Sequence, residues 1–202
     1  SSIDKLKMEY AAELVATLSN AITSAGDSVG YAFFTDKIVR HQPPTRGLKQ
    51  HYELMSALVD PRFYGGGYDL TEALGFTTAY MKQFSIVIIV SDFIGLKDNW
   101  KRELKGMGKK YDLIGIMIRD IRDKILPEYH GKVTLGDPFT HKQIVVDIDE
   151  KSEEYTRYVE SEEKEIKKAL NESGSDFIEL TTDKTFIKPI TDLFLERARR
   201  HR

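Results

Sequence analysis

Residues 85–93 read Ser-Ile-Val-Ile-Ile-Val-Ser-Asp-Phe, an apolar run rich in β-branched side chains that ends in the carboxylate of Asp92. A continuous run of this kind and length is typical of a strand buried on both faces of a parallel sheet. In open α/β sheets, ligands bind outside the carboxyl ends of such strands. The stretch therefore predicts an α/β fold with Asp92 at the edge of the sheet where binding is expected.

A glycine-rich segment comes shortly before that strand. Residues 64–70 read Tyr-Gly-Gly-Gly-Tyr-Asp-Leu, and a helical pattern follows from Leu70 to about Phe84. The three glycines suit a loop with positive φ angles at least as well as a cradle for phosphate. Because neither a Gly-x-x-x-x-Gly-Lys-Ser/Thr nor a Gly-x-Gly-x-x-Gly motif follows a strand, the sequence gives poor support to nucleotide binding.

The rest of the chain alternates between strand and helix patterns. The alternation implies right-handed crossovers and a three-layer, Rossmann-like αβα architecture with a mostly parallel central sheet and an antiparallel edge strand. We expect one domain over residues 1–202. Strands are expected at 28–34, 38–40, 113–118, 132–135, 143–147 and 177–180, and helices at 6–24, 47–58, 97–109, 150–171 and 186–200.

Two finer expectations concern residues 38–58. Pro43-Pro44 is expected to end the short strand at 38–40, because proline cannot donate to a strand ladder. In the helix at 47–58, the side expected to be buried carries Leu48, Tyr52, Met55 and Leu58.

Composition narrows the class of protein. The chain has 202 residues, a net charge of −2 and no cysteine. The lack of cysteine excludes disulfides, thiol catalysis and cysteine–zinc sites, and it fits a reducing compartment, so we expect a cytoplasmic protein. The near-neutral charge gives no argument for binding nucleic acid, and no apolar stretch approaches the ~20 residues of a membrane span.

Several short motifs occur in the order and spacing of one known family. They are Lys7-Met8-Glu9-Tyr10-Ala11-Ala12-Glu13-Leu14, Gly26-Asp27-Ser28-Val29-Gly30, Phe34-Thr35-Asp36, Pro43-Pro44-Thr45-Arg46-Gly47, Gly66-Gly67-Tyr68-Asp69-Leu70, Ser91-Asp92-Phe93, Arg119-Asp120-Ile121-Arg122-Asp123, Leu126-Pro127, Gly131-Lys132-Val133 and Leu135-Gly136-Asp137-Pro138. Together they resemble the von Willebrand factor A-type (vWA) domain. More narrowly, the chain resembles prokaryotic vWA-like proteins of unassigned function that are often encoded beside MoxR-type AAA+ ATPases.

The resemblance implies a metal-ion-dependent adhesion site. In vWA domains its ligands are an Asp-x-Ser-x-Ser loop after the first strand, a threonine in a Gly-Gly-Thr loop and an aspartate after the fourth strand. Asp92 matches the aspartate and is the expected ligand of Mg²⁺, a hard cation that prefers oxygen. Tyr68 stands where the threonine is usual, and no Asp-x-Ser-x-Ser precedes Lys7. The site is therefore expected to be degenerate, and Tyr68 to weaken it or convert it to metal-free recognition.

The resemblance also implies a central first strand, between the strands at 28–34 and 85–93. The sequence begins about where the loop after that strand would end. A sheet lacking the strand would leave two rows of backbone groups unpaired. We therefore expect residues upstream of Ser1, or another chain, to supply it. Direct pairing of the two flanking strands would contradict this expectation.

Other candidate residues have alternative interpretations. Asp92 could be a helix N-cap just past the end of its strand, where it would stabilise the next turn. Asp120, Asp123 and Glu128 form a carboxylate cluster after the strand at 113–118, which suits a solvated loop better than acid–base chemistry. The five histidines are scattered without the spacing of metal ligands.

We expect a non-enzymatic protein-interaction domain. The partner-binding residues would be Gly66, Gly67, Tyr68, Asp69 and Asp92, and the resemblance implies a MoxR-type AAA+ ATPase as partner in assembling or maturing protein complexes. The alternatives are a metal-dependent hydrolase using Asp92 with the nearby carboxylates, and a structural scaffold that binds no metal.

Overall fold

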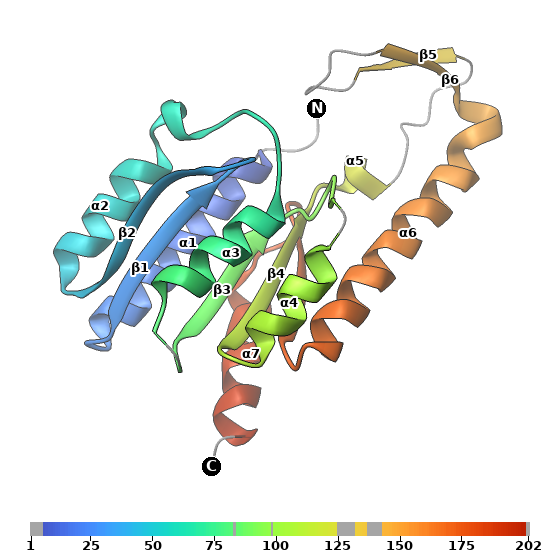
Figure 1. Cartoon of the computed structure of the whole chain (residues 1–202). Coiled ribbons are helices and arrows are strands. Elements are labelled where there is room, and N and C mark those ends of the chain that lie inside the picture. Colours follow the sequence, from blue (N-terminus) through green and yellow to red (C-terminus); the bar gives the residue numbers. More distant parts are fainter. Residues whose placement is uncertain (1–5, 83, 98, 125–131, 137–142, 201–202) are drawn as a thin grey trace.

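A parallel sheet forms the centre of the molecule. The structure is a computed structural model that describes residues 6–82, 84–97, 99–124, 132–136 and 143–200 (Figure 1). The sheet has the strand order β3-β4-β7, and both pairings are parallel, as the apolar runs predict. Its strands are β3 (Ile86–Ser91), β4 (Asp112–Arg119) and β7 (Asp176–Thr181).

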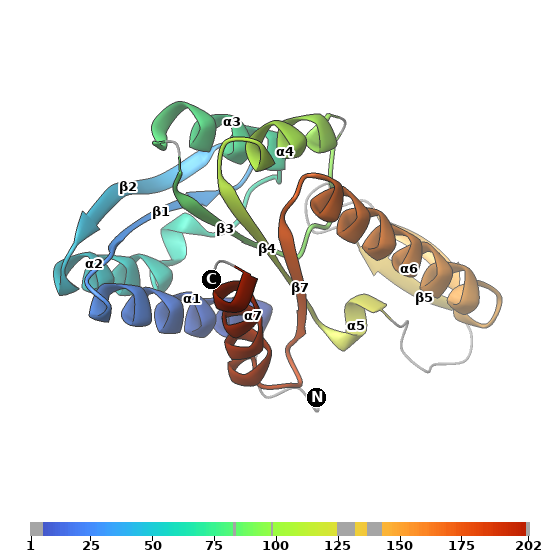
Figure 2. The ribbon, with the colours of Figure 1, turned by 90° about the horizontal axis from the view of Figure 1, so that it is seen from below.

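Helices cover both faces of this sheet (Figure 2). Side chains alternate between the faces along β4, so that Met117 joins one apolar cluster and Ile116 the other. The αβα layering predicted from the sequence is confirmed. On the Ile116 face lie α1 (Lys7–Ser24) and α7 (Ile187–Arg200), and on the Met117 face lie α3 (Leu70–Tyr80), α4 (Trp100–Gly108) and α6 (Ile148–Glu172).

A second, antiparallel sheet consists of β1 (Ser28–Phe34) and β2 (Ile38–Arg46). The prediction that β2 would stop before Pro43-Pro44 is wrong, because the strand continues through both prolines. The outer strand of a pair can accept proline where no ladder donor is needed. Gly30 lies opposite, and a Cβ on it would lie 2.7 Å from the backbone nitrogen of Pro44, so only glycine leaves room for the proline.

Helix α2 (Leu48–Leu58) follows, and its buried side differs from the predicted one. Leu48 and Tyr52 are exposed, whereas Leu54, Ala57 and Gln50 are buried. Gln50 can be buried because its amide binds the hydroxyl of Thr45 at 2.8 Å and the carbonyl of Pro43 at 3.3 Å. The buried side of α2 is therefore a different one from the side that the spacing of apolar residues predicted.

The strands β1 and β3 are not paired with each other. Among the described residues, β3 has β4 as its one strand neighbour, and Ile86 is 57% exposed. The prediction that this strand is buried on both faces is therefore wrong for Ile86, and within the strand Ile89 is the one buried residue. Direct pairing of β1 with β3 would have contradicted the strand expected between them. Since the two are unpaired, that strand stays a prediction.

The remaining elements lie outside the two main sheets. The predicted hairpin is confirmed and consists of β5 (Lys132–Gly136) and β6 (Gln143–Asp147), which pair antiparallel beside the start of α6 (Figure 1). The helix expected to reach Phe84 ends at Tyr80. Short helical turns occur at η1 (Pro61–Phe63) and α5 (Ile121–Lys124). Within the described part of the chain, no helix is both long and apolar enough to cross a bilayer.

Candidate functional site

Polar side chains gather where β3 and β4 end. Asp92 directly follows β3, and Arg119 and Asp120 close β4. Because the two strands are parallel and paired in register from Ile86–Asp112 to Ser91–Met117, their carboxyl ends share one edge of the sheet. We call this edge, with the glycine loop at 64–69 and the loop at 92–97, the rim.

The glycine loop is fixed against the turn between β1 and β2. Gly65 and Gly66 have φ angles of 90° and 97°, which the loop interpretation predicts. A Cβ on Gly66 would lie 3.6 Å from the side chain of Thr35, and the backbone nitrogen of Asp69 donates to the carbonyl of Thr35 at 2.8 Å. The loop therefore has a defined place at the rim.

Tyr68 links the glycine loop to the end of β3. Its hydroxyl lies 3.1 Å from the Oγ of Ser91, which also accepts a hydrogen bond from the backbone nitrogen of Phe93 at 3.0 Å. Its ring lies 5.8 Å from the ring of Phe34. Burial raises the pKa of the Tyr68 phenol above its ordinary value of about 10. Tyr68 therefore joins the glycine loop to the end of β3 through its hydroxyl and to β1 through its ring.

Asp69 begins α3. One carboxylate oxygen accepts a hydrogen bond from the backbone nitrogen of Thr71 at 3.0 Å, and the other lies 2.9 Å from the Nζ of Lys97. Hydrogen bonds from Thr71 and then from Lys97 lower the pKa of Asp69. Asp69 therefore stabilises the helix start and holds the loop at 92–97 beside the glycine loop.

Asp92 has two different partners. Its Oδ1 accepts a hydrogen bond from the backbone nitrogen of Ile94 at 3.2 Å and so stabilises the turn at 94–95. The interpretation of Asp92 as a helix N-cap is wrong, because the next helix begins at Trp100 with Asn99 as its N-cap. The Oδ2 of Asp92 lies 3.0 Å from the Nζ of Lys7, in the first turn of α1. The same Nζ donates to the Oδ2 of Asp123 at 2.9 Å. Burial lowers the pKa of Lys7, but the hydrogen bond and charge of Asp123 and the charge of Asp92 outweigh it, so the pKa is raised.

The carboxylate cluster after β4 comes together only in part. Asp123 shares Lys7 with Asp92, and its carboxylate accepts a hydrogen bond from the backbone nitrogen of Asp120 at 3.0 Å. The carboxylate of Asp120 accepts hydrogen bonds from the backbone nitrogen of Arg122 at 2.9 Å and from the hydroxyl of Thr182 at 3.3 Å. It therefore stabilises the turn after β4. Glu128 lies outside the described residues.

These residues do not fit the Mg²⁺ that the vWA resemblance implies. A divalent cation of this kind takes about six oxygen ligands at about 2.0–2.6 Å. Here two carboxylates face an ammonium, and the hydroxyl of Tyr68 is engaged with Ser91. Over residues 6–82, 84–97, 99–124, 132–136 and 143–200, no three acidic, histidine or cysteine side chains form a group that could hold a metal.

A buried charge pair lies beneath the rim. Arg119 is 2% exposed, and its Nε lies 3.6 Å from the Oε1 of Glu163 on α6. Within the part of the chain that the structure describes, the Nε and Nη2 of Arg119 have no hydrogen-bond partner. Glu163 also pairs with Lys124 at 3.1 Å, and Lys124 pairs in turn with Glu179. The guanidinium therefore depends on one carboxylate among the described residues.

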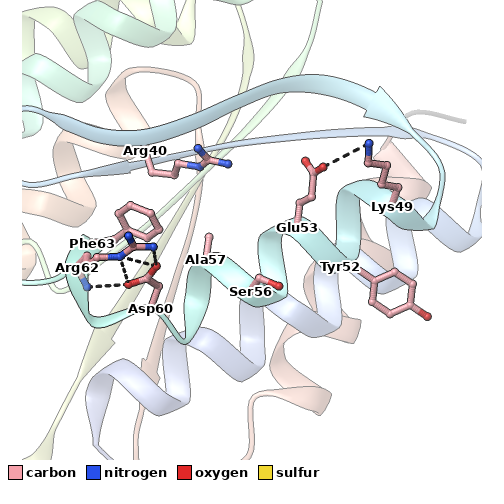
Figure 3. Close-up of a pocket in the computed structure, with 9 residues that line it drawn as sticks. All are labelled: Arg40, Lys49, Tyr52, Glu53, Ser56, Ala57, Asp60, Arg62 and Phe63. Atoms are coloured by element: carbon pink, nitrogen blue, oxygen red, sulfur yellow. Dashed lines mark hydrogen bonds and ion pairs between the residues drawn. The ribbon is translucent and has the colours of Figure 1, made fainter.

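A separate groove lies away from the rim. It has a volume of about 700 Å³ and lies between β2 and α2 (Figure 3). Two ion pairs occupy its wall, Asp60 with Arg62 and Lys49 with Glu53. None of the residues lining it belongs to the rim, so we do not assign the candidate site to it. The lining residues are Arg40, Lys49, Tyr52, Glu53, Ser56, Ala57, Asp60, Arg62 and Phe63.

Comparison with known sequences identifies the family. Residues 1–166 match the family described as "Protein of unknown function DUF58". The chain belongs to the DUF58 family. Relatives of this DUF58 chain include "Uncharacterized protein Rv1480" of Mycobacterium tuberculosis (strain ATCC 25618 / H37Rv) and "Uncharacterized protein Mb1516" of Mycobacterium bovis, each 22% identical over 196 residues. The match covers 96% of this chain and 61% of each relative, so the chain spans about three fifths of their length.

Two solved structures resemble the fold of this chain. The conserved hypothetical protein BatB from Bacteroides thetaiotaomicron has a TM-score of 0.60 at 13% identity, over 98% of this chain and 91% of BatB. An aerotolerance-related membrane protein from Bacteroides fragilis NCTC 9343 has a TM-score of 0.53 at 13% identity, over 86% of this chain and 80% of that one. At such identities the likeness concerns the fold alone, and it agrees with the αβα layers.

Proposed function

We propose that this DUF58 chain is a non-enzymatic, cytoplasmic protein-interaction domain of the vWA type, and that it binds its partner through the rim. The proposed partner is a MoxR-type AAA+ ATPase, with which the domain would act in assembling or maturing protein complexes. The observation that carries the proposal is the convergence of the glycine loop, Tyr68, Asp69 and Asp92 at one edge of the parallel sheet.

The chemistry of the rim supports recognition more than catalysis. Each carboxylate there has a structural partner: Asp69 has Lys97 and Thr71, and Asp92 has Lys7 and Ile94. A hydrolase would need at least one carboxylate able to accept a proton or activate water within a cavity. The groove of Figure 3 shares no residue with these groups. A fixed, partly exposed polar surface is instead what a protein partner can match with its own polar groups.

The experiment is native mass spectrometry of the purified domain mixed with a MoxR-type AAA+ ATPase from the same organism. We expect a complex with the wild type, and a weaker complex with Asp92→Ala. Phe84→Ser is the matched control, because Phe84 is 93% exposed and precedes the opposite, amino end of β3. If no complex forms with or without Mg²⁺, this partner is wrong. If both variants bind like the wild type, the rim is not the binding surface.

A further inference from the structure

One ammonium joins two distant carboxylates at the rim. The Nζ of Lys7 lies 3.0 Å from Asp92 and 2.9 Å from Asp123. The three residues come from the start of α1, the end of β3 and the turn after β4, and they are separated by 85 and 116 positions in the sequence. All three side chains are partly buried, so solvent screens their charges less than it would on an open surface.

The ammonium stands where a bridging cation would be needed. Two carboxylates that face one point repel each other unless a positive charge lies between them. A divalent ion within about 2.0–2.6 Å of both carboxylates would have to displace the Nζ, because the ammonium already lies at hydrogen-bond distance from each. A lysine ammonium at these distances from both carboxylates competes with any metal for the same two oxygens.

We propose that Lys7 is the resident cation of the rim, and that its ammonium takes the place of a divalent metal ion between Asp92 and Asp123. The rim then has no Lewis acid with an open position for a partner's carboxylate. It offers carboxylate oxygens with one negative charge in excess over the ammonium, which favours contacts with a partner's basic groups. The inference concerns the surface named in the proposed function, but its experiment needs no partner and can succeed or fail independently.

The test measures thermal unfolding with and without about 1 mM Mn²⁺, at constant ionic strength. This concentration is at the upper end of the dissociation constants of about 10⁻⁴–10⁻³ M known for weak divalent-cation sites made of oxygen ligands. Wild-type protein is expected to show no shift in its midpoint beyond about 1 °C. Lys7→Met is expected to unfold about 3–8 °C lower than wild type, and Mn²⁺ is expected to restore at least about half of this loss, because the two carboxylates then need another cation.

Lys97→Met is the matched control, since it removes the lysine that pairs with the single carboxylate of Asp69. It should show no recovery with Mn²⁺. The inference is overturned if wild type is stabilised by Mn²⁺ as much as Lys7→Met, or if Lys7→Met responds no more than Lys97→Met. Electron paramagnetic resonance of wild-type protein in Mn²⁺ gives a second readout that depends on no variant folding. The inference is also overturned if wild-type protein gives a signal of bound Mn²⁺ and the Asp92→Asn variant does not.

Discussion

Glu163→Gln tests the charge pair that supports the rim. Arg119 is 2% exposed at the end of β4, and Glu163 is its one carboxylate partner among the described residues. The substitution keeps the size and one oxygen of the side chain but removes its charge. The guanidinium then stays buried without a counter-charge, whereas Lys124 keeps Glu179 as a partner.

The structure sets the size of the effect. Breaking a buried ion pair by removing one partner costs about 3–5 kcal/mol of unfolding free energy. We expect about 3 kcal/mol, the lower end of that range, because Arg119 and Glu163 lie 3.6 Å apart and Glu163 is shared with Lys124. Replacing both members, as in Arg119→Met with Glu163→Leu, should recover most of the loss, since no uncompensated charge is then buried.

Urea denaturation followed by circular dichroism measures this free energy. The control is Glu165→Gln on the same helix, because Glu165 pairs with Lys101 and both side chains are about half exposed. An exposed pair of this kind contributes at most about 1 kcal/mol. If Glu163→Gln proves as mild as Glu165→Gln, the reasoning fails, and Arg119 would not depend on Glu163 for its burial.

Two further predictions use the same denaturation measurements. Gly108→Ala should lower the free energy of unfolding by about 1–3 kcal/mol, because its Cβ would lie 2.1 Å from the carbonyl oxygen of Ser173. Gly106→Ala is the control and should raise it by up to about 1 kcal/mol, because no atom lies within 4 Å of the added Cβ. Burial raises the pKa of Tyr68 above its unfolded value of about 10, so its stabilising contribution is full below that pH and is lost as the pH rises further. Tyr68→Phe should therefore lose less stability than wild type between about pH 10 and 12; an equal loss would contradict this.

The main strands of the fold could be predicted because their apolar runs are long. The runs at 85–93 and 113–118 became β3 and β4, paired in parallel as predicted. The second sheet was harder, because β2 crosses two prolines and is possible only where Gly30 leaves room for Pro44. The buried side of α2 was missed for a similar reason. It carries Gln50, whose burial depends on partners in β2 that a hydrophobic pattern does not record.

Only the part of the site next to β3 could be predicted from the sequence. Asp92 follows an apolar strand and the glycine loop precedes it, so the rule for parallel sheets places both at one edge. Lys7 carries no such signal. A lysine in the first turn of a helix usually faces solvent, and its two partners are 85 and 116 positions away. The buried pairing of Arg119 with Glu163 was missed too, because it joins a strand end to a distant helix.

Hydrogen–deuterium exchange of the domain, free and in complex with the ATPase, tests most directly whether the rim is the binding surface. The account predicts slower exchange on binding in the peptides that contain residues 64–70 and 91–97, with little change in the groove at residues 40–62. Protection confined to that groove, or to the amino ends of the strands around Phe84, would contradict it.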